Sequence, residues 1–182
     1  MAGEPPPERR KIITWDDPRA AAREVRRMSG ADFFDAMRRG RIPEPPFGKL
    51  LGIDLFDAGE GHFMMSLQPD EVHYNPMGCV HGGILATLLD SVMSAAVHTA
   101  LPAGRSYLTT ALEVKFLRPV FQATGEIMAE GHLVSCEGNV ATAEGQIFDS
   151  RENLYARATA TCRVFDSQQP RPPAPGGEPK SE

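Results

Sequence analysis

The spacing of apolar residues divides the middle and end of the chain into short segments with the length and composition of strands. These segments are 52–59, 61–68, 107–118, 125–134, 139–149 and 154–165. The first two meet at the turn 58–61, which is rich in glycine and predicts a hairpin. In 107–118, Leu108, Leu112, Val114 and Phe116 alternate with more polar side chains, so a strand with one buried face is expected.

A helix is predicted between the second and third strands, from Gly82 to about Ala100. Apolar or small side chains cover almost its whole circumference, which is typical of a helix enclosed by other structure. The last strand carries small residues on one face, a surface that a helix can approach closely. These residues are Ala156, Ala158, Ala160 and Cys162. The order strand, strand, helix and four strands predicts an α+β fold, with a curled antiparallel sheet wrapped around one long central helix.

The N-terminal part of the chain has a pattern of residues that differs from that of this domain. Residues 16–46 are predicted to form a helical extension, with start signals at Asp17-Pro18 and at 29–32, and prolines from Pro43 onwards stop the helix. The domain that follows spans 47–166. The tails 1–15 and 167–182 are expected to be disordered, because they are rich in polar residues and proline.

Charge and composition restrict the function. The net charge is −5, and the acidic charge lies in residues 42–182, which argues against nucleic acid as a partner. Three cysteines without a CxxC pair favour reduced thiols. The first residues lack the apolar run of a signal peptide, and the most apolar run, 84–100, contains Asp90 and is short for a membrane helix. A soluble, cytoplasmic protein without a membrane partner is therefore expected.

The candidate chemistry lies where the apolar helix begins. A polar loop containing Asn75 leads to His81, Gly82 and Gly83, and Asp90 follows inside the helix. Free N–H groups at a helix N-terminus stabilise negative charge, and glycine lets a carbonyl approach the backbone, so an oxyanion hole is a candidate here. Small neighbours leave room beside Asp90, and a carboxylate in apolar surroundings is suited to taking a proton from water.

One helix cannot bring both groups to the same carbonyl. Nine residues separate His81 from Asp90, which is about 13 Å along a helix axis. A second subunit would place its own Asp90 opposite the Gly82 of the first. The spacing therefore predicts at least a dimer.

The motif N-x5-HGG-x6-D from Asn75 to Asp90, followed by TT-x5-FLRP from Thr109, resembles the hotdog acyl-CoA thioesterases of the phenylacetic-acid-degradation type. The resemblance covers roughly residues 47–165. It implies a hotdog fold, a homodimer or a homotetramer built as a dimer of dimers, and hydrolysis of an aryl- or medium-chain acyl-CoA. Coenzyme A is then part of the substrate, and no separate cofactor is expected.

By position, the resemblance implies that Asp90 is the general base or nucleophile. It also implies that Asn75 orients water or the carbonyl, that the Gly82 amide after His81 forms the oxyanion hole, and that Thr109 supplies a hydroxyl. Gly83 and Arg118 are candidates for binding coenzyme A.

Each of these residues also has a plainer interpretation. Asn75 before Pro76 is typical of a turn, His81 of a helix cap, and the two glycines of a tight bend. Thr109 could be an ordinary strand residue, and Arg118 a solvated surface charge. Cys79 and His81 could suggest zinc, but no second ligand pair stands at suitable spacing, so no metal is expected.

Two rival functions remain open at this point. A hotdog protein could bind an acyl-CoA without turnover, as a sensor or carrier. An acyl-CoA hydratase or dehydratase on the same fold is a third reading, although its Asp and His residues would follow another pattern.

Overall fold

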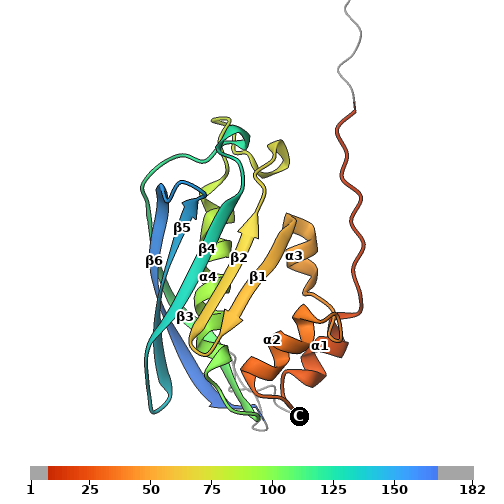
Figure 1. Cartoon of the computed structure of the whole chain (residues 1–182), viewed down its shortest axis with the longest axis vertical. Coiled ribbons are helices and arrows are strands. Elements are labelled where there is room, and N and C mark those ends of the chain that lie inside the picture. Colours follow the sequence, from red (N-terminus) through yellow and green to blue (C-terminus); the bar gives the residue numbers. More distant parts are fainter. Residues whose placement is uncertain (1–7, 168–182) are drawn as a thin grey trace, which may run out of the picture.

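The computed structural model describes residues 8–167, and within them six strands form one antiparallel sheet around a long helix (Figure 1). The strand order across the sheet is β1-β2-β4-β5-β6-β3, so β1 and β3 are its edges. The strands are β1 (Ile53–Gly59), β2 (His62–Leu67), β3 (Arg105–Phe116), β4 (Ile127–Glu137), β5 (Val140–Asp149) and β6 (Leu154–Asp166). The central helix is α4 (Gly82–Thr99). The α+β prediction and the hairpin between β1 and β2 are confirmed.

The sheet lies very close to α4 because small residues face the helix. Ala156, Ala158, Ala160 and Cys162 of β6 are all buried, as their spacing predicted. Gly131 of β4 pairs with Gly145 of β5, and a Cβ added at Gly131 would lie 2.4 Å from the carbonyl of Val92 in α4. Helix and strand backbones therefore touch at Gly131, and a larger residue there would displace one of them.

The N-terminal extension packs against one end of this assembly (Figure 1). It contains α1 (Pro18–Glu24) and α2 (Gly30–Arg38), and α3 (Pro46–Leu51) follows at the start of the predicted domain. The predicted start signals are confirmed: the side chain of Asp17 caps α1, and that of Ser29 caps α2. Gly30 lies against the carbonyl of His98, where a Cβ would be only 1.7 Å from the oxygen, so α2 is tightly docked on the end of α4.

Two short segments before β1 have features that the sequence did not predict. The prolines were expected only to stop a helix, but Pro46 occupies the first turn of α3, where its missing N–H is not needed, and Gly52 ends this helix in the left-handed conformation. Residues 8–17 have no helix or strand, and Arg9 pairs with Glu71 while Lys11 donates to the carbonyl of Leu50. The remainder of the predicted tails, 1–7 and 168–182, lies outside the described residues.

The prediction of one apolar face along β3 was wrong, because this strand contains a bulge. Thr109 pairs with Cys162 and Ala111 with Thr161, so Thr110 is an extra residue in β3. The inward face changes at this point from Tyr107 and Thr109 to Leu112, Val114 and Phe116. Leu108 instead pairs with the exposed Arg163, on the outer face.

Candidate active site

The carboxylate of Asp90 is held by the strand next to α4. Asp90 is half-buried, and the hydroxyl of Thr109 donates a hydrogen bond of 2.8 Å to its Oδ1. The bulge in β3 makes this contact possible, because Thr109 precedes the change of face and points inward toward buried Cys162. Two residues that the motif singled out therefore meet in one chain.

A cavity of about 600 Å³ opens beside Asp90. On its α4 side Asp90, Ser94 and His98 follow one another at intervals of four residues and form a polar stripe on the helix. The opposite wall is apolar and comes mostly from the N-terminal extension and from β1 and β2. It includes Ala21, Val25, Phe33, Phe34, Met37, Phe47, Leu55, Phe63 and Met65. The extension thus builds one wall of the cavity next to the carboxylate.

Two titratable side chains that line this cavity, His98 and Tyr107, are neutral near neutral pH. Burial lowers the pKa of His98 to about 4. Its ring lies among Phe33, Phe34 and Tyr107. Burial also raises the pKa of Tyr107 and outweighs the opposing hydrogen bond from Ser94. The part of the cavity next to His98 and Tyr107 is therefore suited to an uncharged group.

The N-terminus of α4 carries the second half of the candidate chemistry. His81 is the N-cap, and its Nδ1 accepts a 2.8 Å hydrogen bond from the amide of Gly83. Within the part of the chain that the structure describes, the amide of Gly82 has no hydrogen-bond acceptor. A Cβ at Gly82 would lie 3.2 Å from Cζ of Phe116. Gly82 thus offers a free donor beside an aromatic ring, whereas the amide of Gly83 is already engaged.

Asn75 organises the loop before α4. Its Oδ1 accepts from the amides of Met77 and Cys79, at 2.8 and 3.4 Å, and its own amide nitrogen donates to Sγ of Cys79. These are the contacts of a turn residue. The side chain acts within its own loop, next to the end of α4 that bears Gly82.

Arg118 lies near the same end of α4. It follows β3, two residues before Val120, whose carbonyl accepts from the amide of Val80. The guanidinium is exposed and donates 3.1 Å to Oδ1 of Asn153. It is a cation at the rim of the region that holds the free Gly82 amide.

The two halves of the site are separated along α4. Gly82 and Asp90 are eight residues apart, about 12 Å at the rise of an α-helix. Asp90 with Thr109 and the free amide of Gly82 therefore cannot meet at one substrate carbonyl within a single chain.

Sequence reasoning missed Ser94, His98, Tyr107 and the wall formed by the N-terminal helices. A signal for two of them was present: Asp90, Ser94 and His98 are polar positions of an otherwise apolar helix, repeated every four residues. The wall had no comparable signal, because it depends on how α1 and α2 pack against the core of the domain.

Comparison with known proteins identifies the family of the chain. The Thioesterase superfamily matches residues 77–156. A protein of Halobacterium salinarum that is provisionally named an esterase is 30% identical over 139 residues, which are 72% of this chain and 90% of that protein.

Solved structures show the same fold. A phenylacetic acid degradation-related protein from Ralstonia eutropha is 31% identical, with a TM-score of 0.65 over 71% of this chain and 98% of that one. The PaaI protein of the phenylacetic acid degradation operon of Escherichia coli is 20% identical, with a TM-score of 0.65 over 76% of this chain and 96% of the other. A Streptococcus mutans protein bound to acetyl-CoA is 19% identical, with a TM-score of 0.58 over 64% and 91% of the two chains.

A curled sheet around one long helix, with an acid inside that helix and glycines at its start, defines a hotdog-fold thioester hydrolase. The chain belongs to the Thioesterase superfamily.

None of the helices within residues 8–167 has both the length and the apolar character needed to span a membrane.

Proposed function

We propose that this protein hydrolyses an aryl- or medium-chain acyl-CoA to the free acid and coenzyme A. The observation that carries the proposal is the position of the Asp90 carboxylate, which is held by Thr109 and lines a largely apolar cavity. The solved protein from Streptococcus mutans, which has the same fold, holds acetyl-CoA. In this proposal the acyl group occupies the cavity, and coenzyme A extends toward solvent past Arg118 and the start of α4.

The chemistry follows from the two ends of α4. The thioester oxygen accepts a hydrogen bond from the Gly82 amide of one subunit, with the helix dipole behind it. The partner subunit supplies the Asp90 carboxylate, which either removes a proton from the attacking water or attacks the carbonyl carbon itself. The C–S bond then breaks, and coenzyme A leaves as its thiol after taking a proton. In the second route, water hydrolyses the resulting mixed anhydride.

The subunit partner would lie along β3. This strand is an edge of the sheet, so one side of its backbone has no neighbouring strand within residues 8–167. Several apolar side chains on it and just after it are partly exposed: Leu108, Leu112, Phe116, Leu117 and Phe121. Pairing of two copies at this edge would cover these side chains and could bring the Gly82 of one copy toward the Asp90 of the other.

The cytoplasm remains our proposed location, and the three free cysteines, one of them exposed, suit a reducing compartment.

The test measures thiol release from phenylacetyl-, benzoyl-, hexanoyl- and decanoyl-CoA by the wild type and by Asp90→Asn. We expect saturable hydrolysis by the wild type and a loss of about 10²- to 10⁴-fold in Asp90→Asn, as for removal of a general base. Circular dichroism and the molar mass in solution check that the variant still folds and assembles. A folded Asp90→Asn protein with wild-type rates would exclude the proposed role of Asp90.

If the wild type released no thiol from any of the four substrates, the result would instead favour a hotdog protein that binds acyl-CoA without turnover. Equilibrium dialysis with the same thioesters separates this outcome from an inactive preparation, because a binding protein would still retain ligand.

A further inference from the structure

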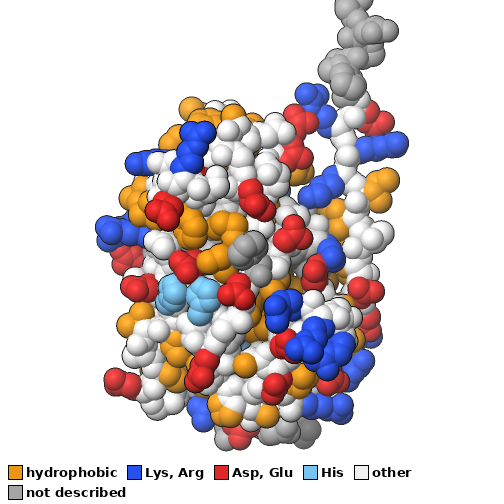
Figure 2. Space-filling view, viewed as in Figure 1, with side chains coloured by type: hydrophobic (Ala, Val, Ile, Leu, Met, Phe, Trp, Pro, Cys, Tyr) orange, Lys and Arg blue, Asp and Glu red, His pale blue; other side chains and the backbone are white. Residues whose placement is uncertain are grey.

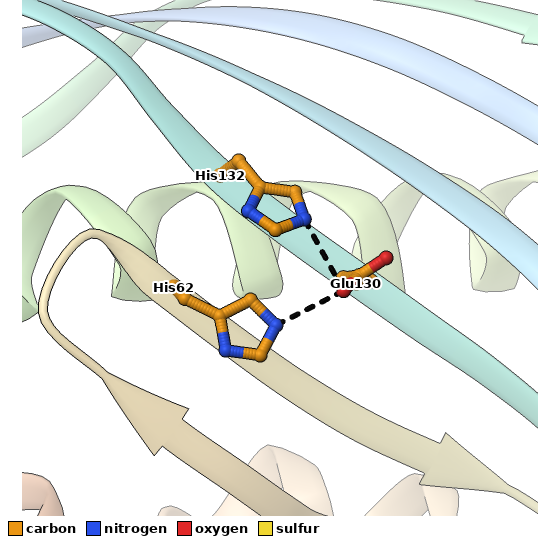
Figure 3. A group of neighbouring side chains, drawn as sticks. All are labelled: His62, Glu130 and His132. Atoms are coloured by element: carbon orange, nitrogen blue, oxygen red, sulfur yellow. Dashed lines mark hydrogen bonds and ion pairs between the residues drawn. The ribbon is translucent and has the colours of Figure 1, made fainter.

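Two histidines and a glutamate converge on the outer face of the sheet, away from the cavity (Figure 3). Nε2 of His62 lies 3.1 Å from Oε1 of Glu130, and Nε2 of His132 lies 3.2 Å from the same oxygen. The nearest ligand atoms of the three side chains all lie within 4.8 Å of one another. Figure 2 shows histidine side chains side by side on this face, with acidic side chains next to them.

Strand geometry accounts for the convergence. His62 of β2 pairs directly with His132 of β4, and Glu130 stands two residues before His132, so all three project from the same face. Phe63, which follows His62, points the other way and lines the cavity. The cluster and the candidate active site are therefore on opposite faces of the sheet.

The scaffold under this cluster is rigid. Gly131, between Glu130 and His132, lies against the backbone of α4, with a would-be Cβ 2.4 Å from the carbonyl of Val92. The β4 backbone consequently has little room to move at the point from which two of the three side chains extend. Groups on packed strands are positioned more accurately than groups on loops.

The Glu130 carboxylate stands between the other polar side chains of the cluster. Gln146 donates to Oε2 at 3.2 Å, which leaves Oε1 to the two imidazoles. Two rings thus direct the same kind of nitrogen at one oxygen, whereas a single ring would be enough to satisfy it.

We propose that His62, Glu130 and His132 form a binding site for a divalent transition-metal ion such as Zn²⁺. In a tetrahedral zinc site with ligand bonds of about 2.05 Å, neighbouring ligand atoms are separated by about 3.3 Å. The two nitrogen–oxygen distances, 3.1 and 3.2 Å, already match the edges of such a tetrahedron.

The donor set selects the class of ion. Two imidazole nitrogens and one carboxylate oxygen suit zinc and its neighbours in the first transition row, whereas Mg²⁺ and Ca²⁺ prefer oxygen ligands. Three protein ligands leave at least one position for water or for a ligand from solution. The side chain of His132 is 47% exposed, so an ion can reach the site from solvent.

Metals are first removed from the full-length protein with a chelator. Binding of Zn²⁺ is then measured by isothermal titration calorimetry. We expect one ion per chain in the wild type and loss of this stoichiometric binding in His62→Asn, His132→Asn and Glu130→Gln. Gln146→Ala, which frees Glu130 without removing a ligand, should weaken binding about 10- to 100-fold. Glu137→Gln is the matched control, because Glu137 is an exposed carboxylate on the same strand outside the cluster.

Mg²⁺ should give no binding in the same titration, and Co²⁺ should produce the visible absorption of a low-coordinate site in the wild type only. The proposal is overturned if the wild type does not bind Zn²⁺ stoichiometrically, or if folded His62→Asn and His132→Asn both bind it as well as the wild type does. Circular dichroism of each variant establishes that it is folded. Thioester hydrolysis does not enter this readout, so the outcome is independent of the proposed function.

Discussion

Thr109 is the side chain through which β3 contacts the candidate catalytic carboxylate. Its hydroxyl donates to Asp90, and its Oγ1 lies 3.9 Å from Sγ of buried Cys162. A hydrogen bond to a charged group is worth about 1.5–3 kcal/mol. The contact therefore matters both for the orientation of the carboxylate and for its stability in a half-buried position.

Replacing Thr109 by valine should lower kcat/KM about 10- to 100-fold, because loss of this hydrogen bond leaves the Asp90 carboxylate without its donor. Thr109→Ser keeps a hydroxyl and should retain most of the activity. The matched control is Thr110→Val, since the neighbouring hydroxyl is exposed and donates to the carbonyl of Thr161 instead. Thiol release gives the rates, and full activity of Thr109→Val would show that Thr109 has no positioning role.

Residues of the site differ in how far the sequence predicts them. Gly82 and Asp90 belong to one short motif on one helix, so their type and spacing suffice to mark them. His62, Glu130 and His132 come from two strands separated by more than sixty positions, and only the register of β2 on β4 brings them together. The expectation of no metal considered Cys79 and His81, which are close in sequence, and could not include this group.

At the scale of elements, α1 has two faces with different surroundings. Ala21 and Val25 line the cavity, whereas Ala22 lies on the outer side among the arginines of the same helix. Basic side chains gather over this region in Figure 2, near α1 and α2 of Figure 1. The extension is therefore placed to limit the length of group that the cavity accepts.

Ala21→Phe should fill part of the cavity and shift the preference toward shorter acyl-CoAs, with decanoyl-CoA losing more activity than hexanoyl-CoA. Ala22→Phe adds the same ring to the outer face of α1 and should leave this ratio unchanged. The measurement is kcat/KM for the two substrates in each variant. An unchanged ratio in a folded Ala21→Phe protein would mean that the acyl group does not reach α1.

Elements were predicted well where hydrophobic spacing is regular, as in α4 and the six strands. Two local features were not predicted, because a periodic pattern of hydrophobic residues does not reveal them. Pro46 opens α3 at a position where proline is tolerated, and the extra residue Thr110 in β3 shows itself only through pairing with β6. A two-residue period alone placed Leu108 and Leu112 on the same face, and the bulge separates them.

For the whole molecule, the decisive property is the distance between the two ends of α4. One chain contains both the Gly82 amide and the Asp90 carboxylate but keeps them about 12 Å apart. The exposed apolar side chains on the β3 edge offer a surface where a second copy could complete the site. Activity and assembly should consequently be lost together.

Leu112→Arg should prevent formation of the proposed oligomer and leave a monomer, because a charge would stand in the proposed contact between two β3 edges. Thiol release should fall to the level of Asp90→Asn. Val134→Arg places the same charge on β4, where Val134 is 61% exposed, and should leave assembly and activity intact. Light scattering after size-exclusion chromatography gives the molar mass, and a fully active monomer would contradict the shared site.

The contacts of β3 with both parts of the site depend on the number of residues in this strand, because of the bulge at Thr110. Thr109, before it, reaches Asp90, and Phe116, after it, covers Gly82. Thr109 and Phe116 are seven positions apart, so in a regular strand their side chains would point to opposite faces of the sheet. The extra residue in the bulge corrects this, and both side chains face α4. The segment can therefore exchange side chains through evolution more easily than it can gain or lose one residue, because any single insertion or deletion would turn either the hydroxyl or the ring to the outside.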